Sequence, residues 1–210
     1  MRAAIAVAGS LNLDLVIRVP RLPVPGETVL GTSFEMVPGG KGGNQACAAA
    51  KLAGKGIEVR MVGRVGYDTF GDHLKASLAA VGVNVAGVHA NQNLPTGVAS
   101  IWVDEAGRNS IVVAPGANAS LAWEDAHPSM KCAAVAMFQL ETPAADVLEL
   151  MRRCRAGGAV TVLDPAPARP LSQDFFEQAD VITPNETETA ILLGTSSTGA
   201  APPVEISARG

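Results

Sequence analysis

A glycine-rich segment at residues 39–46, Gly-Gly-Lys-Gly-Gly-Asn-Gln-Ala, holds the residue types best suited to chemistry in this chain. Glycine lacks a Cβ atom, so a ligand can approach its main chain closely. The alanine-rich run at 45–52 predicts a helix that begins just after these glycines. Because the free N–H groups at a helix N-terminus attract oxygen-rich ligands, we expect this segment to bind a ligand.

Two nucleotide-binding motifs do not fit this segment. A Walker phosphate loop needs a glycine five residues ahead of Gly-Lys-Ser/Thr, whereas Glu35 occupies that position and Gly42 follows Lys41. A dinucleotide fingerprint should close the first strand-to-helix turn of a chain, but two extended segments come first here. Asn44 indicates hydrogen bonds to a neutral polyol. A glycine-rich turn without a ligand is the alternative, which the lysine and asparagine between the glycines disfavour.

Polar side chains also follow several short apolar runs that we predict to be parallel strands. In sheets of this kind, ligands bind beyond the carboxyl ends of the strands. Asp14 and Glu141 would accept hydrogen bonds there while Lys41 donates, which suits a ligand with many hydroxyl groups. Because Asp164 precedes a proline, we interpret it as a turn or cap residue. The polar positions at strand ends are Asn12, Asp14, Glu141, Asp164 and Asn185.

The predicted elements follow the order expected of a doubly wound, mostly parallel α/β sheet flanked by helices. Two proline-interrupted β segments, at 15–19 and 28–37, and a hairpin at 98–113 do not suit a central sheet. They predict a small second sheet that stands off the core. Core strands are predicted at 5–8, 58–62, 133–138, 160–163 and 181–182, and helices at 45–52, 69–81, 121–131, 144–156 and 186–193.

The composition predicts a soluble globular protein. The 210 residues are 48% hydrophobic and 17% charged, which is enough for one domain with a real core. A net charge of −4 with scattered lysine and arginine gives no sign of nucleic acid or membrane as a partner. No apolar run approaches the length of a membrane span, and the first is too short for a signal peptide. The three cysteines lack metal-binding spacing, so we expect reduced thiols and a cytoplasmic protein.

In combination and order, these motifs resemble the ribokinase branch of the PfkB sugar-kinase family. The resemblance extends from residue 7 to about residue 194. It implies that 1–194 form the N-terminal two-thirds of a ribokinase-like domain, that pieces at about 14–39 and 96–114 form a lid over the sugar, and that 195–210 are an irregular tail. The matching motifs are Gly-Ser-Leu-Asn-Leu-Asp at 9–14, Pro-Gly-Glu-Thr at 25–28, the segment at 39–46, Thr-Gly at 96–97, Pro-Gly-Ala-Asn at 115–118, Gln-Leu-Glu at 139–141, Asp-Pro-Ala-Pro-Ala at 164–168 and Thr-Pro-Asn-Glu-Thr-Glu at 183–188.

The resemblance implies a reaction and a role for each matching residue. The reaction is the ATP-dependent phosphorylation of D-ribose at its 5-hydroxyl, with Mg²⁺; another PfkB sugar or nucleoside kinase is the alternative. Asn185 would lie near the ATP phosphates, and Glu188 would organise the Mg²⁺ shell through water. The oligomeric state stays open, with a homodimer through the lid as one outcome. The residues implied to hold the sugar are Asn12, Asp14, Gly40, Lys41, Gly42, Asn44 and Glu141.

One family motif, Asp-Thr-x-Gly-Ala-Gly-Asp, does not occur in this sequence. In the family, its last aspartate is the general base and its amides form the anion hole for the transferred phosphate. The K⁺ site of the branch would also lie outside these residues. Because phosphoryl transfer depends on positioning and charge stabilisation, we expect the chain to be C-terminally truncated and inactive alone. A non-catalytic sugar-binding remnant is the alternative from another functional class.

Overall fold

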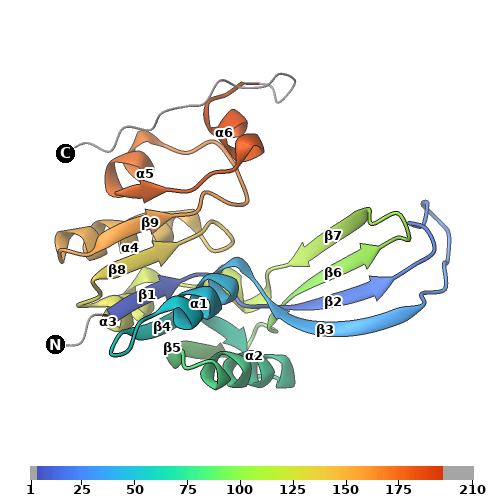
Figure 1. Ribbon diagram of the computed structural model, residues 1–210, viewed down its shortest axis with the longest axis horizontal. Helices are drawn as coiled ribbons and strands as arrows, with labels where there is room; N and C mark the ends of the chain where they lie inside the picture. The colour runs from blue at the N-terminus through green and yellow to red at the C-terminus, as the bar shows by residue number, and fades with distance from the viewer. Residues whose placement is uncertain (1–3, 196–210) are drawn as a thin grey trace.

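The computed structural model describes residues 4–195, apart from the side chain of Asp125. Its centre is a six-stranded sheet in the order β10-β9-β8-β1-β4-β5, in which every neighbouring pair is parallel (Figure 1). The expected α/β class is therefore confirmed. The strands are β1 (Ala4–Ala8), β4 (Glu58–Gly66), β5 (Asn84–Asn91), β8 (Val135–Phe138), β9 (Val160–Leu163) and β10 (Val181–Ile182).

Helices lie on both faces of this sheet, and each face has its own apolar core. Helices α1 and α2 pack on one face against a cluster that includes Val7, Met61 and Leu74. On the other face, α3, α4 and α5 pack against a cluster that includes Phe138 and Leu163. The helices are α1 (Lys41–Leu52), α2 (Thr69–Ala80), α3 (Trp123–Met130), α4 (Ala144–Ala156), α5 (Gln173–Gln178) and α6 (Glu186–Leu192), with a 3₁₀ helix η1 (Gly116–Ser120) before α3.

Helix α4 shows how the sequence produces this layering. Its buried side chains are Val147, Leu150, Met151 and Cys154, which recur at the three- and four-residue spacing of a helix face. Gly157 then ends the helix as its C-cap, and β9 begins at Val160. Amphipathic spacing thus fixes which side of α4 faces the sheet.

A second, four-stranded sheet projects from one end of the central sheet (Figure 1). Its order is β3-β2-β6-β7, with β2 (Asn12–Arg18), β3 (Ser33–Gly39), β6 (Gly97–Val103) and β7 (Asn109–Ala114). The chain enters this sheet twice, from the carboxyl ends of β1 and β5. Apart from Gly39, every residue of β3 and β7 is exposed, so these strands contribute little to the core.

The expected elements were largely correct, with four differences. Strand β5 and helix α5 had no predicted counterpart. The 28–37 segment is a strand only from Ser33 onward, because its partner strand β2 ends at Arg18, opposite Ser33. Helix α1 begins at Lys41 rather than at Gln45, so the expected glycine loop is largely the first helical turn. The tail at 196–210 lies outside the described residues.

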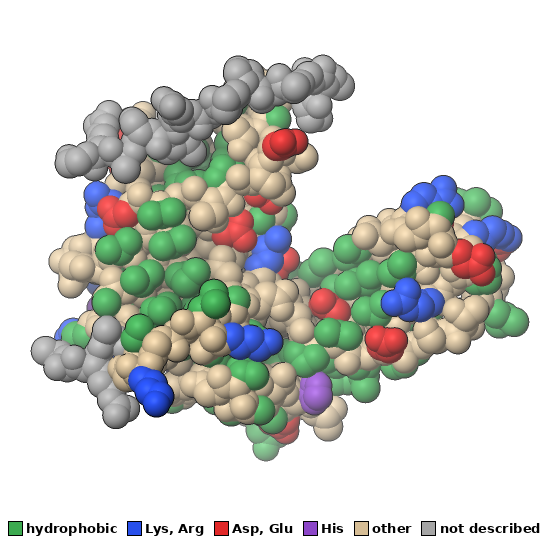
Figure 2. Space-filling model, viewed as in Figure 1, with side chains coloured by type: hydrophobic (Ala, Val, Ile, Leu, Met, Phe, Trp, Pro, Cys, Tyr) green, Lys and Arg blue, Asp and Glu red, His purple; other side chains and the backbone are tan. Residues whose placement is uncertain are grey.

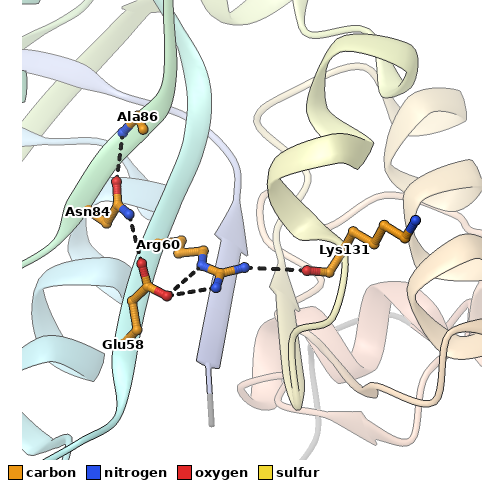
Figure 3. A network of polar contacts seen from close by, with 5 residues as sticks. All are labelled: Glu58, Arg60, Asn84, Ala86 and Lys131. Atoms are coloured by element: carbon orange, nitrogen blue, oxygen red, sulfur yellow. Dashed lines mark hydrogen bonds and ion pairs between the residues drawn. The ribbon is translucent and has the colours of Figure 1, made fainter. Parts of the chain in front are cut away.

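The amino end of the central sheet is held by a polar network (Figure 3). The Glu58 carboxylate accepts hydrogen bonds from the Arg60 guanidinium at 2.6 and 3.0 Å and from the Asn84 amide at 2.7 Å. Arg60 also donates to the carbonyl of Lys131 at 3.3 Å. These contacts join β4, β5 and the residue after α3 at the opposite end of the sheet from the polar positions described next.

Candidate functional site

The start of α1 lies directly on the turn between β1 and β2. Gly40 is the N-cap of α1 with a φ of 85°, a conformation that favours glycine. A Cβ on Gly40 would lie 2.7 Å from the Asn12 nitrogen, and a Cβ on Gly42 would lie 2.7 Å from the Gly9 carbonyl carbon. Glycine is therefore required here by close backbone contact, and the contact brings the first N–H groups of α1 to the sheet edge.

Glu141 and Ser10 hold the start of α1 against this turn through hydrogen bonds. The Ser10 hydroxyl donates to Glu141 Oε2 at 2.5 Å and accepts a hydrogen bond from the Gly42 N–H at 3.3 Å. The Lys41 N–H donates to the same Glu141 oxygen at 3.0 Å. Glu141 therefore supplies the anionic group that a helix N-terminus favours. Ser10 was not among the predicted site residues; its position directly after the first strand and Gly9 was the available signal.

Asn12 is fixed by a second asparagine. The Asn118 amide donates to Asn12 Oδ1 at 2.8 Å and to the Leu11 carbonyl at 3.0 Å, and Asn118 Oδ1 accepts from the Leu11 N–H at 2.9 Å. Both asparagines are buried. The side chain of Asn118 thus ties η1 to the first residues of β2, where the second sheet begins. Its place in the Pro-Gly-Ala-Asn motif was a signal, but no role was assigned to it.

Asp14 lies on one face of the second sheet, in register with Val37 and Ala99. Its carboxylate is so close to β3 that a Cβ on Gly39 would lie 2.3 Å from Oδ2. Burial raises the pKa of Asp14 above its ordinary value, and the nearby Glu141 carboxylate raises it further. A carboxylate that is partly stripped of water gains most from a hydroxyl donor.

Asp164, interpreted from the sequence as a turn or cap residue, lies close enough to Glu141 for that carboxylate to affect its pKa, as it does for Asp14. Burial raises the pKa of Asp164, the Lys41 ammonium opposes this, and the Glu188 and Glu141 carboxylates raise the pKa further. Charged groups from three other segments, Lys41, Glu141 and Glu188, therefore act on the Asp164 carboxylate. Asp164 directly follows β9, and its interpretation as a turn or cap residue stays a prediction.

Asn185 and Glu188 form the N-terminal capping box of α6. The Asn185 side chain accepts from the Glu188 N–H at 2.8 Å, and Glu188 Oε2 accepts from the Asn185 N–H at 2.8 Å. Such a reciprocal pair satisfies two N–H groups that the helix cannot. Each side chain keeps a further polar atom, the Asn185 amide nitrogen and the Glu188 Oε1, for other partners.

Asn44, another predicted site residue, has no described contact with Asp14 or Glu141. It is exposed on the first turn of α1 and lines a cavity of about 240 Å³ with Pro38, Cys47 and Leu78. Pro38 pairs with Leu13, on the opposite face of the second sheet from Asp14.

The arrangement suits a neutral ligand with several hydroxyl groups. The carboxylates of Asp14 and Glu141 can accept hydrogen bonds and the Lys41 ammonium can donate, whereas the first N–H groups of α1 are already bonded to Glu141 and Ser10. Among the described residues, no three His, Cys, Asp or Glu side chains are grouped to hold a metal ion. Carboxylate oxygens such as those of Glu188 and Asp164 are a ligand type that suits Mg²⁺, either directly or through its bound water. No helix among residues 4–195 has the length and apolar character to cross a bilayer.

Comparisons with known proteins agree with this geometry. The model of the pfkB family carbohydrate kinases matches residues 2–206. A ribokinase of Bacillus subtilis (strain 168) is 42% identical over 192 residues, covering 90% of this chain and 64% of the relative. A deoxyribokinase of Salmonella typhi is 38% identical over 194 residues, covering 90% of this chain and 62% of the relative.

A solved structure of the Arabidopsis thaliana ribokinase, complexed with ribose and ATP, has the same arrangement of elements. Its TM-score is 0.85 at 29% identity, with 95% of this chain and 65% of that chain covered. The chain thus spans less than two thirds of the length of these relatives. Because the family model matches nearly all of the chain, the chain belongs to the pfkB family of carbohydrate kinases.

Proposed function

We propose that this chain carries the sugar-binding part of a ribokinase-type enzyme, which phosphorylates D-ribose at its 5-hydroxyl with ATP. The observation that carries the proposal is that Glu141 bonds the N-terminus of α1 close to the partly buried Asp14 carboxylate, at the mouth of the second sheet. Asn12, Asp14, Gly40, Lys41, Gly42, Asn44 and Glu141 are the proposed sugar-binding residues.

The second sheet is the proposed lid. It is joined to the body at Asn12, Gly39 and Gly97, directly beside Asp14. Closure over the sugar would exclude water, which would otherwise compete with the sugar hydroxyl for the phosphoryl group. A sugar buried between the lid and the α1 N-terminus would have its acceptor hydroxyl directed toward the carboxyl ends of β8 and β9.

The proposed phosphate side comprises Asn185, Glu188 and Lys41. Asn185 lies near the ATP phosphates through its free amide nitrogen, and Glu188 orients water on the Mg²⁺ ion. The Mg²⁺ ion, when bound with ATP, neutralises charge on the transferred phosphoryl group. The 210 residues hold no Asp-Thr-x-Gly-Ala-Gly-Asp segment, so we propose that this chain alone binds sugar but does not transfer phosphate.

Calorimetric titration of D-ribose into the 210-residue protein tests the substrate. We expect D-ribose to bind more tightly than D-fructose and adenosine, and no ribose-dependent release of ADP from ATP. A preference for 2-deoxy-D-ribose would move the assignment to a deoxyribokinase, which the 38% identical relative makes the main alternative. A preference for adenosine would overturn the sugar assignment, and robust ADP release would overturn the proposed inactivity.

We also propose that the lid mediates a homodimer. Large apolar side chains are exposed on both of its faces, among them Phe34, Met36, Ile111, Val112 and Val113. Exposed apolar patches of this kind on a projecting sheet mark interaction surfaces.

A further inference from the structure

Thr96, the residue that precedes β6, is bound to the body by the side chain of Asp68, which lies between β4 and α2. Asp68 Oδ2 accepts a hydrogen bond from the Thr96 N–H at 2.8 Å, and Asp68 Oδ1 accepts one from the Thr96 hydroxyl at 2.6 Å. The Thr96 hydroxyl oxygen in turn accepts from the N–H of Gly66, the last residue of β4, at 2.9 Å. These three bonds hold the entry to β6 against the carboxyl end of β4.

Asp68 is also the N-cap of α2, but the helix does not account for the bonds to Thr96. As the cap, Asp68 Oδ1 accepts from the Gly71 N–H at 2.9 Å. Serine caps a helix about as well with its single oxygen. Burial raises the pKa of Asp68, but the bonds from Thr96 and from backbone N–H groups outweigh burial and lower the pKa below its ordinary value. Asp68 is therefore charged at neutral pH, and a charged acceptor makes stronger hydrogen bonds than a neutral one.

Gly97, the first residue of β6, packs against the amides of Asn12 and Asn118. A Cβ on Gly97 would lie 2.3 Å from Asn12 Oδ1 and 2.3 Å from Asn118 Nδ2. These are the two atoms that form the hydrogen bond between the asparagines. Any displacement of the Gly97 backbone toward them would therefore displace the Asn12 side chain. The placement of Thr96 by Asp68 thus limits the orientations that are available to Asn12.

The placement of the second sheet depends on the contacts at its base. Figure 2 shows this sheet projecting from the body, with an open space between its outer part and the body. At the base, the Pro95 carbonyl accepts a hydrogen bond from the N–H of Ala117 on η1 at 2.7 Å. Asn118, the next residue of η1, bonds to Asn12. Residues 95–97, η1 and Asn12 therefore form one junction, and Asp68 connects that junction to the central sheet.

We propose that Asp68 is a positioning residue for the sugar site, which acts through Thr96 and Gly97 on the Asn12 amide. This role rests on the proposed function, since Asn12 matters here as a sugar-binding residue. Both carboxylate oxygens of Asp68 are already bonded to Thr96 and Gly71, so the effect of Asp68 on the sugar is indirect. A binding side chain that is held in place before the ligand arrives loses less conformational freedom on binding, which strengthens the affinity.

The variant Asp68→Ser separates positioning from helix capping. The serine hydroxyl can cap α2, but it lies closer to the main chain than the carboxylate oxygens and cannot also bind Thr96. We expect α2 to keep its rate of hydrogen exchange. Exchange should become faster at residues 97–103 and at the Leu11 N–H, which bonds to Asn118 Oδ1. The affinity for D-ribose, measured by calorimetry, should fall about 3–30-fold.

Asp72→Ser is the matched control for this variant. It removes the same charge from an exposed position in the first turn of α2. Because Asp72 has no described contact with Thr96, the affinity for D-ribose and the hydrogen exchange of residues 97–103 should both stay at the parent values.

Thr96 provides an independent variant with a conservative rescue. Thr96→Val removes the hydroxyl that donates to Asp68 and accepts from Gly66, so the affinity for D-ribose should fall by a similar factor. Thr96→Ser keeps a hydroxyl at the same position and should retain the parent affinity. Because Asp68 and Thr96 act through one contact, the double variant Asp68→Ser with Thr96→Val should bind D-ribose no more weakly than the weaker single variant.

Parent affinity for D-ribose in Asp68→Ser would overturn the proposal, and so would an equal loss of affinity in Asp72→Ser or in Thr96→Ser. Faster exchange throughout α2 in Asp68→Ser would assign a loss of affinity to the helix cap, which also overturns it. A parent chain that does not bind D-ribose would contradict the proposed function instead. Hydrogen exchange at Leu11 and at residues 97–103 would then decide the role of Asp68, and unchanged rates in Asp68→Ser would count against it.

Discussion

Gly9, the residue directly after β1, shows how closely the groups around the site are packed. A Cβ at this position would lie 1.8 Å from the Gln139 side-chain oxygen, and Gln139 is fully buried. The Gln139 amide nitrogen donates to Gln45 on α1 at 2.6 Å, so Gln139 cannot move without disturbing the helix. A methyl group at Gly9 would therefore displace Gln139 and disturb its hydrogen bond to Gln45 on α1.

We predict that Gly9→Ala lowers the free energy of unfolding by about 1–3 kcal/mol, the usual cost of overpacking a rigid core. Urea denaturation measures the change. Gly54→Ala is the control, because a Cβ there meets no atom within 4 Å. It should change stability by less than about 0.5 kcal/mol. Equal effects from the two variants would contradict the assigned contact.

The environment of Asp14 also leads to a prediction, on how stability depends on pH, because burial and the Glu141 carboxylate raise the pKa of Asp14. A raised pKa in the folded state means that this group's contribution to stability is greatest below its ordinary pKa and is lost as the pH rises through the raised value. Asp14→Asn should therefore be more stable than the parent chain at pH 7, with a flatter pH dependence above pH 4.

The same substitution should weaken D-ribose binding about 10–100-fold at pH 7, since hydrogen bonds to charged groups contribute about 1.5–3 kcal/mol. In the parent chain, affinity should fall as the pH is lowered through the raised pKa of Asp14, because the protonated acid is a poorer acceptor. Calorimetry and thermal unfolding on the same samples measure the two effects. Unchanged ribose affinity in Asp14→Asn would remove Asp14 from the sugar site.

At the scale of elements, two residues of the α6 capping box have both a structural role and a proposed role in binding ATP and Mg²⁺. Asn185 and Glu188 satisfy each other's backbone N–H groups, so the cap explains their presence without any nucleotide. Their proposed contacts with ATP and Mg²⁺ depend on the atoms that the capping box does not use, the Asn185 amide nitrogen and Glu188 Oε1. Substitutions that keep the cap but change those atoms distinguish the two roles.

We predict that Asn185→Ala speeds hydrogen exchange across α6 and costs about 1 kcal/mol of local stability, the typical value of an N-cap. Glu188→Gln keeps the capping box, because glutamine serves at that position too. It should leave hydrogen exchange near the parent rate but reduce the Mg²⁺ dependence of ATP binding. If Glu188→Gln retained the full Mg²⁺ dependence, the proposed metal role would be wrong.

At the scale of the whole molecule, the second sheet, our proposed lid, exposes apolar side chains that no other part of its fold covers. Val112 and Val113 are neighbours on β7 that point to opposite faces, and they are 68% and 46% exposed. Val113 is in register with Ala99, on the side of Asp14, whereas Val112 is in register with Ser100.

We predict that the protein sediments as a dimer and that either Val112→Lys or Val113→Lys makes it a monomer. The pair is internally controlled, because both changes add the same charge to the same strand. The variant that disrupts the dimer identifies the contacting lid face. A dimer that persists in both variants would show that the subunits meet elsewhere. A parent chain that sediments as a monomer would show that the lid does not mediate a dimer.

The sequence by itself determined the α/β class, the projecting second sheet and most of the residues at the strand ends. Periodicity placed α4, β9 and β10 at their observed bounds, because each has a clear apolar pattern and a clear stop. Strand β5 was missed because its alternation is weak and only Gly87 and Val88 are buried. Helix α5 is a single short element with Phe175 as its one buried residue, so it had little periodic signal.

Only the tertiary structure decided how the site is held together. The bonds of Ser10 to Glu141 and of Asn118 to Asn12 join residues more than a hundred positions apart, which local spacing cannot reveal. The same is true of Asp164, whose acidity depends on carboxylates and a lysine from three other segments. Sequence pattern records which face of each element is apolar. The order of strands in the sheet decides which strand ends meet, and therefore which polar groups share a site.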